Sequence, residues 1–263
     1  MQKYIISALL LFFIFNFSTQ AQIMNIERFR LDKDTFNVWM GNIGFGFSNK
    51  KQKVAMFQYN ANANIAYLSR RHSYMTINYI KFIKVEKTDV LSEGYTHWRI
   101  NFMRRKFLSY EPFVQFQYDL GRGLQYRQLA GFSFRFNVHS QDKVNVGFNT
   151  GAMWEVEEWK GAVLRFPLET DSTRAQTNFI KSTTNLFAKI PLSKQVTFFS
   201  IMYYQARFDD FFHPRFINDT QLQIALGKHF AFNSQFTSTL DAAPILQNNG
   251  FVYSLSSSLN YRF

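Results

Sequence analysis

Long runs of alternating polar and apolar residues constrain this chain more than any other feature of its sequence. Between residues 55 and 68, apolar side chains at Phe57, Tyr59 and Ile65 alternate with amides such as Gln58 and Asn60. A second run covers residues 144–157 without losing its phase. A period of two predicts β-strands. Because strands of soluble sheets usually have about five to six residues, runs of this length favour strands that cross a bilayer.

The same test predicts an all-β fold, a single antiparallel transmembrane β-barrel of about twelve strands in a Gram-negative outer membrane. All five prolines fall between the predicted segments, as expected because proline cannot donate to a strand ladder. These prolines are Pro112, Pro167, Pro191, Pro214 and Pro244. The predicted strands are 36–48, 54–68, 73–84, 95–107, 113–120, 124–138, 144–157, 175–190, 196–208, 217–228, 230–241 and 251–263.

The first residues have the pattern of a secretory signal. Lys3, an apolar stretch from Tyr4 to Phe17 and the small residue Ala21 predict cleavage before Gln22. A membrane anchor is the alternative, but polar residues interrupt the stretch, which is shorter than the roughly 20 residues that a spanning helix needs. We therefore expect a signal peptide at 1–21, a periplasmic lead-in at 22–35 and the barrel at 36–263, with the mature N- and C-termini periplasmic.

The predicted connections alternate between short and long. If both termini are periplasmic, the periplasmic connections are all short, namely 69–72, 108–112, 139–143, 191–195 and 228–229. The long connections all fall on the other side, at 85–94, 158–174, 209–216 and 242–250, beside two tight turns at 49–53 and 121–123. Short periplasmic turns and longer extracellular loops are typical of outer-membrane barrels.

The charge balance of the chain is strongly basic. Lys and Arg number 30 against 18 Asp and Glu, a net charge of +12, which falls to about +11 when the presumed leader with Lys3 is removed. Such a charge suits an anionic partner, either nucleic acid or lipid. Export argues against nucleic acid, so we expect outer-membrane lipid and lipopolysaccharide as partners. The chain contains no cysteine for a thiolate metal site or a disulfide, and we predict no metal and no cofactor.

Charged residues in the polar register of the strands are expected to face the lumen. In one interpretation they line a water-filled pore, and in the other they pair across the barrel and fill it. Large inward residues, among them Met56, Phe113, Leu129 and Met153, favour the filled lumen. We expect Arg127 or Arg135 to pair across it with Glu155 or Asp119. The predicted lumen-facing charged residues are Asp119, Arg127, Arg135, Glu155, Glu157, Lys181, Lys189 and Asp241, followed by Arg262 in the last strand.

Aromatic residues in the apolar register are expected to face lipid. Tyr and Trp near strand ends would form interfacial girdles, and Phe the hydrocarbon band between them. Carbohydrate binding by Trp154, Trp159 and Lys160 in the longest loop is a weaker alternative. The expected outward aromatics are Trp39, Phe45, Phe47, Tyr59, Tyr67, Tyr79, Trp98, Phe102, Tyr118, Phe134, Phe148, Trp154, Tyr253 and Tyr261.

The last residues and three internal stretches carry resemblances. Leu259, Tyr261 and Phe263 alternate at the C-terminus, which looks like the terminal strand signal that the barrel assembly machinery recognises. The chain resembles the salt-induced outer-membrane protein family, domain of unknown function 481, but has Ala206 where proline is expected. This resemblance implies a barrel and no particular chemistry. It rests on 111–119 with 125–127 and Gly131, on 203–205 with 211–216, and on 260–263.

Catalytic motifs are not recognisable in the sequence. His72, His139 and His229 fall in predicted periplasmic turns, and neither His97 nor His213 has a recognisable serine spacing. We expect a barrel without enzymatic activity, with a structural role or slow passage of small solutes. An accessory subunit of a multiprotein envelope complex is the alternative, and an outer-membrane lipid hydrolase is third.

Overall fold

The computed structural model describes residues 37–51, 54–141, 144–160, 174–227, 230–242 and 250–261. The expected leader 1–21 and lead-in 22–35 lie outside these ranges and stay predictions. In the described part of the chain, no helix has the length and apolar character needed to cross a membrane. The strands are β1 (Val38–Lys51), β2 (Ala55–Leu68), β3 (Ser73–Val85), β4 (Thr88–Asn101), β5 (Leu108–Asp119), β6 (Leu124–Gln141), β7 (Val144–Lys160), β8 (Arg174–Pro191), β9 (Val196–Arg207), β10 (Arg215–Ala225), β11 (Phe230–Asp241) and β12 (Phe251–Tyr261).

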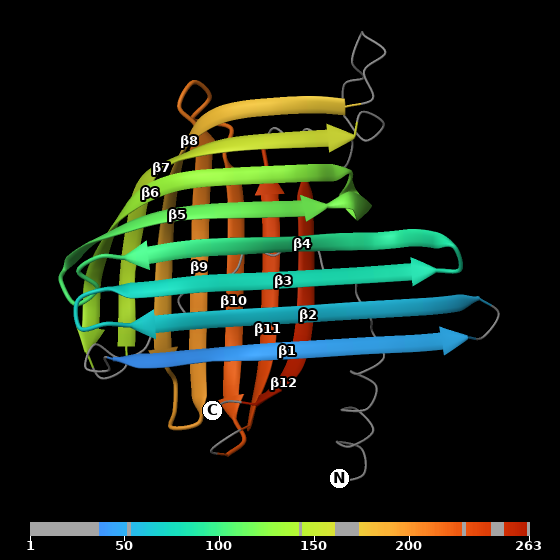
Figure 1. Ribbon diagram of the computed structural model, residues 1–263. Coiled ribbons are helices and arrows are strands. Elements are labelled where there is room, and N and C mark those ends of the chain that lie inside the picture. The colour runs from blue at the N-terminus through green and yellow to red at the C-terminus, as the bar shows by residue number, and fades with distance from the viewer. Residues whose placement is uncertain are drawn as a thin grey trace.

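The strands form one antiparallel sheet in sequence order, which confirms the predicted all-β fold and its twelve strands. The short 3₁₀ helix η2 (Leu120–Arg122) follows β5. In Figure 1, β1 to β8 cross the front of the molecule and β9 to β12 run steeply behind them, as tilted strands on opposite walls of a barrel do. Among the described residues, the ladder runs from β1 to β12 and does not join these two edge strands.

The connection expected at Val85–Gly94 is not a long loop. β3 and β4 continue to a tight turn at Glu86 and Lys87, so β4 begins at Thr88 instead of 95. Glu86 adopts a positive φ of 54°, and its backbone N–H donates to the Ala55 carbonyl at 2.7 Å. This contact fixes the hairpin against the start of β2. The many charged residues of the segment suggested a loop, whereas they lie on a long strand extension.

Two prolines lie within strands, contrary to the sequence prediction. Pro191 is the last residue of β8, and Pro112 lies inside β5, opposite Phe132 of β6. On its other side, the β4–β5 ladder ends at Arg99 and Phe113, and only an isolated bridge between Phe102 and Tyr110 follows. A strand tolerates proline where no neighbour needs its missing N–H. β5 therefore begins at Leu108, and the connection before it is 102–107.

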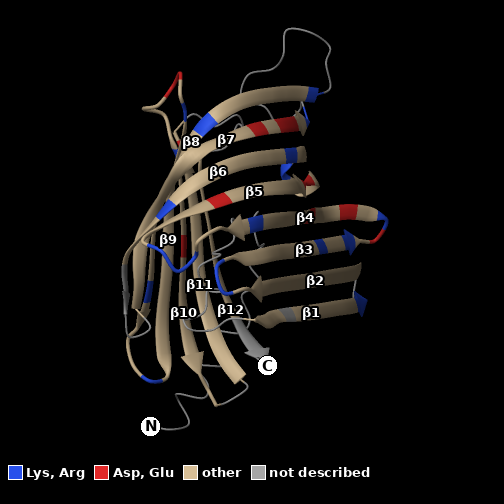
Figure 2. Ribbon diagram, turned by 60° about the vertical axis from the view of Figure 1, so that its left-hand side comes forward, with Lys and Arg blue, Asp and Glu red and all other residues tan. Residues whose placement is uncertain are grey.

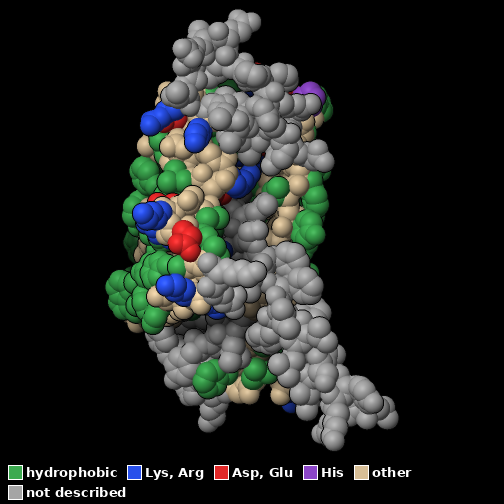
Figure 3. Space-filling model, turned by 90° about the vertical axis from the view of Figure 1, so that its right-hand side faces the viewer, with side chains coloured by type: hydrophobic (Ala, Val, Ile, Leu, Met, Phe, Trp, Pro, Cys, Tyr) green, Lys and Arg blue, Asp and Glu red, His purple; other side chains and the backbone are tan. Residues whose placement is uncertain are grey.

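The sheet has a polar inner face and an apolar outer face. The described residues include 25 buried polar or charged side chains against 17 buried hydrophobic ones, the reverse of a soluble core. Large apolar side chains such as Trp39 (70% exposed) and Ile43 (76%) point outward. Figure 3 shows hydrophobic side chains along the outer flanks, with charged side chains nearer the middle of that view. This arrangement places the candidate site inside the sheet.

Candidate functional site

Charged side chains from both walls meet near the end of the barrel where β7 ends and β8 begins. Arg127 Nε donates to Glu155 Oε2 at 2.9 Å and lies 3.1 Å from Glu157 Oε1, and Lys181 Nζ also pairs with Glu155. Both glutamates are 1% exposed. Figure 2 shows the acidic residues of β7 beside the basic residues of β6 and β8. We call this group the Arg215 network; it consists of Arg127, Glu155, Glu157, Lys181, Arg215 and Asp241.

Arg215 joins strands that are not neighbours in the sheet. From β10, its Nη1 lies 3.4 Å from Glu157 Oε1 and 3.8 Å from Glu155 Oε2, both on β7. Its Nε donates to Asp241 Oδ2 on β11 at 2.9 Å. A single guanidinium thus links the back wall to the front wall. Trp159 adds a further bond, because its indole N–H donates to Glu157 Oε2 at 2.9 Å.

The charges of this region balance. With the neighbouring Asp119 and Arg122, the Arg215 network contains four cations and four carboxylates. Asp119 Oδ1 accepts from the Arg122 backbone N–H at 3.1 Å. Burial, followed by the nearby Arg215 and Arg127, lowers the pKa of Arg122, and Asp119 opposes this shift. Equal numbers of opposite charges favour mutual pairing over a strong field for attracting ions.

A second polar group lies farther along the lumen, and we call it the Glu111 cluster. It consists of Arg99, Asn101, Glu111 and Asn149. Glu111 is fully buried, and it accepts from Arg99 Nη1 at 2.9 Å, Asn101 Nδ2 at 2.6 Å and Asn149 Nδ2 at 3.4 Å. All four residues lie on the front wall, on β4, β5 and β7. This cluster stabilises one wall and does not reach across the lumen.

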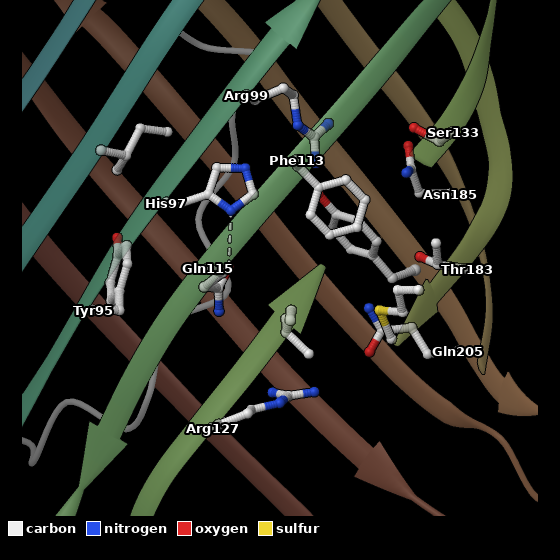
Figure 4. Close-up of a pocket in the computed structure, with 14 residues that line it drawn as sticks. Tyr95, His97, Arg99, Phe113, Gln115, Arg127, Ser133, Thr183, Asn185 and Gln205 are labelled. Atoms are coloured by element: carbon white, nitrogen blue, oxygen red, sulfur yellow. Dashed lines mark hydrogen bonds between the residues drawn. The ribbon is translucent and has the colours of Figure 1, made fainter. Parts of the chain in front are cut away.

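A small cavity separates the two groups, as Figure 4 shows. Its volume is about 40 Å³, and Phe113, Leu129 and Met153 form its apolar part. His97 Nδ1 shares a hydrogen bond of 3.0 Å with Gln115 Oε1, and the His97 ring stacks on Phe113 at 5.7 Å between ring centroids. A polar cavity of this size holds about three water molecules. It is far smaller than the lumen of an open porin.

The structure brings together some of the residues predicted to face the lumen and separates others. Arg127, Glu155, Glu157, Lys181 and Asp241 all join the Arg215 network, and Asp119 lies beside it. Arg135 and Lys189 lie elsewhere: the Arg135 guanidinium is 3.6 Å from the centroid of the Phe187 ring, and Lys189 Nζ is 5.8 Å from that of Phe199.

The pairing expected across the lumen was wrong in its partners. Arg127 pairs with Glu155 between adjacent strands, because β6 and β7 are neighbours in the sheet. The residue that crosses the lumen is Arg215, which the sequence analysis had placed in a loop. Glu111 and Arg99 were also missed, although Glu111 shares the inward phase of Phe113 and Asp119. Pro112 had made this segment look like a connection.

Two aromatic residues face inward instead of outward. Tyr79 was expected to face lipid, but its hydroxyl donates to Glu93 Oε1 at 3.1 Å. It shares the inward phase of the buried residues Met75 and Ile77 on β3. Trp159 was expected in a carbohydrate-binding loop, but it lies in β7 and is 5% exposed. Residue type alone did not determine which face these side chains occupy.

The proposed assembly signal lies mainly outside the described side chains. The backbone of Leu259 and Tyr261 belongs to β12, whereas Arg262 and Phe263 lie outside the described residues. In the loop after β9, His213 Nδ1 lies 2.6 Å from Asp210 Oδ1. In that loop a hydrogen bond from Arg207 lowers the pKa of Asp209. Across the described ranges, no three His, Asp or Glu residues are grouped so as to hold a metal.

Comparisons with known proteins identify no family. No family model and no curated protein matches this chain. A solved structure described as the NanC porin is similar with 7% identity and a TM-score of 0.46, over 84% of this chain and 99% of the porin. The translocator domain of the autotransporter NalP from Neisseria meningitidis is similar with 11% identity and a TM-score of 0.44, over 86% of this chain and 88% of that domain. Neither likeness contributes to the argument about function.

Proposed function

We propose that this chain is an integral outer-membrane β-barrel protein without enzymatic activity, with a largely filled lumen and a structural role or slow passage of small solutes. The observation that carries the proposal is the Arg215 network, since it connects opposite walls of the barrel with buried, balanced charges. The resemblance to the salt-induced outer-membrane protein family belongs to the same proposal.

The distribution of polar and apolar side chains supports the membrane position. Polar groups face inward and aromatic groups face outward, as in barrels that use lipid as their outer solvent. The strands have 11 to 18 residues. At about 3.3 Å per residue and a tilt of about 40°, even the shorter strands extend roughly 30 Å along the membrane normal, the thickness of a hydrocarbon core.

The packing of the interior supports a low conductance. Besides the Arg215 network, apolar residues from both walls occupy the lumen, with Phe113, Leu129 and Met153 on the front wall and Phe187 and Ile201 on the back. The remaining cavity of about 40 Å³ has space for only a few water molecules. A solute that passes would have to displace buried, paired side chains.

Conductance in planar bilayers tests this proposal. The purified, folded protein should conduct far less than an open general porin, and Arg215→Ala should raise the conductance because it removes the link between the walls. Arg174→Ala is the matched control, since Arg174 is exposed and pairs only with Glu158 in the part described. A large, stable conductance of the unmodified protein would replace the filled barrel with a diffusion channel.

Single cysteines test the proposed orientation, with the termini and the turn 192–195 in the periplasm. The chain has no cysteine of its own, so labelling is easy to interpret. On intact cells, a membrane-impermeant maleimide should label Asp209→Cys and not Ser193→Cys. The reverse result would invert the barrel in the membrane.

An accessory role in a larger envelope complex is the second candidate. The described edges β1 and β12 are not joined to each other, and an exposed strand edge can pair with another chain. Gentle detergent extraction should then recover a stoichiometric protein partner. Recovery of the barrel alone would favour the primary proposal.

A further inference from the structure

Two neighbouring turns at one end of the barrel contain a dense cluster of cations. They are 69–72, between β2 and β3, and 102–107, between β4 and β5, at the left-hand end of Figure 1. We call them the basic turns. Neither contains an acidic residue, and together they contribute Arg70, Arg71, Arg104, Arg105 and Lys106.

Hydrogen bonds hold the basic turns together. The Arg104 backbone N–H donates to the Arg71 carbonyl at 3.0 Å, and Arg104 Nε donates to the Ser69 carbonyl at 3.1 Å. The Met103 N–H donates to His72 Nδ1 at 3.3 Å. These bonds fix two cationic segments side by side despite the repulsion between like charges. The arrangement is therefore organised before any anion binds.

The basic turns lie where the apolar outer surface ends. Phe102 and Phe107 are exposed within the second turn. The Phe102 ring is 5.2 Å from the His72 ring, and the Phe107 ring is 5.9 Å from that of Phe136. Aromatic residues of this kind mark the membrane–water interface. The neighbouring cations are thus at the level of the lipid headgroups.

The opposite end of the barrel has a mixed charge. The turn after β3 contains both Glu86 and Lys87, and the loop after β9 contains Asp209 and Asp210 beside Arg207. An anion gains most from a site without competing carboxylates. The two ends therefore differ in their expected preference for anionic headgroups.

We propose that the basic turns bind the phosphodiester headgroups of anionic phospholipids, such as phosphatidylglycerol. Arginine presents a planar fork of donors that matches phosphate oxygens, and Lys106 adds a flexible charge. Exposed Phe102 and Phe107 contact the adjacent acyl chains. This inference rests on the proposed membrane position and adds a lipid class and a site to it.

Lipid retention in native mass spectrometry tests the site. The folded protein, reconstituted with phosphatidylcholine and phosphatidylglycerol in equal amounts, should retain phosphatidylglycerol preferentially. The triple variant Arg70→Gln, Arg71→Gln and Lys106→Gln should retain it about ten-fold less. Arg104 is left in place because it holds the turns together. The control is Lys50→Gln with Lys51→Gln, an exposed pair at the other end of β1, which should leave retention unchanged.

Several results would overturn the lipid site. Equal retention of the two lipids would remove it, and so would an equal loss in the Lys50 and Lys51 control, because charge number alone would then explain binding. Displacement of the lipid by inorganic phosphate at a matched concentration would assign the turns to a free anion. A protein that inserts in neither type of vesicle would instead reject the membrane position itself, which separates the two failures.

Discussion

The Arg215 network and the Glu111 cluster solve the same problem in different ways. Both bury carboxylates inside the sheet and satisfy them with guanidinium groups. The Glu111 cluster does so within the front wall, whereas the Arg215 network uses one residue of the back wall to bind two glutamates of the front wall. Buried charge thus stabilises a wall in one place and sets the width of the lumen in the other.

The largest effect is expected from Arg215→Ala. This change leaves Glu155, Glu157 and Asp241 with fewer buried cations, so the free energy of unfolding should fall by about 3–5 kcal/mol. Urea unfolding of the protein in lipid vesicles, followed by tryptophan fluorescence, measures this loss. A decrease below about 1 kcal/mol would mean that water already solvates these carboxylates.

A somewhat smaller effect is expected from Met153→Ala, between the two groups. Met153 is 2% exposed and packs on Phe113 and Leu129 beside the cavity. Truncation should cost about 2–4 kcal/mol in unfolding free energy because it enlarges the cavity. Conductance should rise less than in Arg215→Ala, since the link between the walls persists. A rise as large as that of Arg215→Ala would show that packing, not charge, closes the lumen.

Glu111→Gln should separate the two regions most clearly. The amide still hydrogen-bonds Asn101, but Arg99 loses a buried counter-charge, so a cost of about 1–3 kcal/mol is expected. Conductance should not change, because the Glu111 cluster lies on one wall. Increased conductance in this variant would contradict the distinction drawn here between the two regions.

The smallest effect is expected from Arg174→Ala. The Arg174 side chain is 65% exposed where it pairs with Glu158 at 2.9 Å. Exposed ion pairs contribute about 0–1 kcal/mol, so stability and conductance should both stay close to those of the unmodified protein. Thermal unfolding in the same vesicles gives this comparison. A cost similar to that of Arg215→Ala would remove burial as the explanation for the larger effects.

The sequence predicted the sheet better than it predicted the contacts inside it. Glu155 and Glu157 could be placed in the lumen because they lie in a long alternating run, where the phase determines the face. The contribution of Arg215 could not be predicted, because its partners lie 58 and 60 residues away and meet it only through the curvature of the sheet. Pro112 hid Glu111, since only the strand order shows that the β4 side of β5 tolerates a missing donor.

The strict alternation of inner and outer faces makes insertions and deletions more harmful than most substitutions. One extra residue near the middle of β7 would shift the phase of all that follow it in the strand. Glu155 and Glu157 would then point toward lipid, and Trp154 would enter the lumen in their place. Charged residues on the lipid face of a barrel are strongly unfavourable at mid-bilayer depth. Changes in chain length should therefore be tolerated in the connections and excluded from the strands.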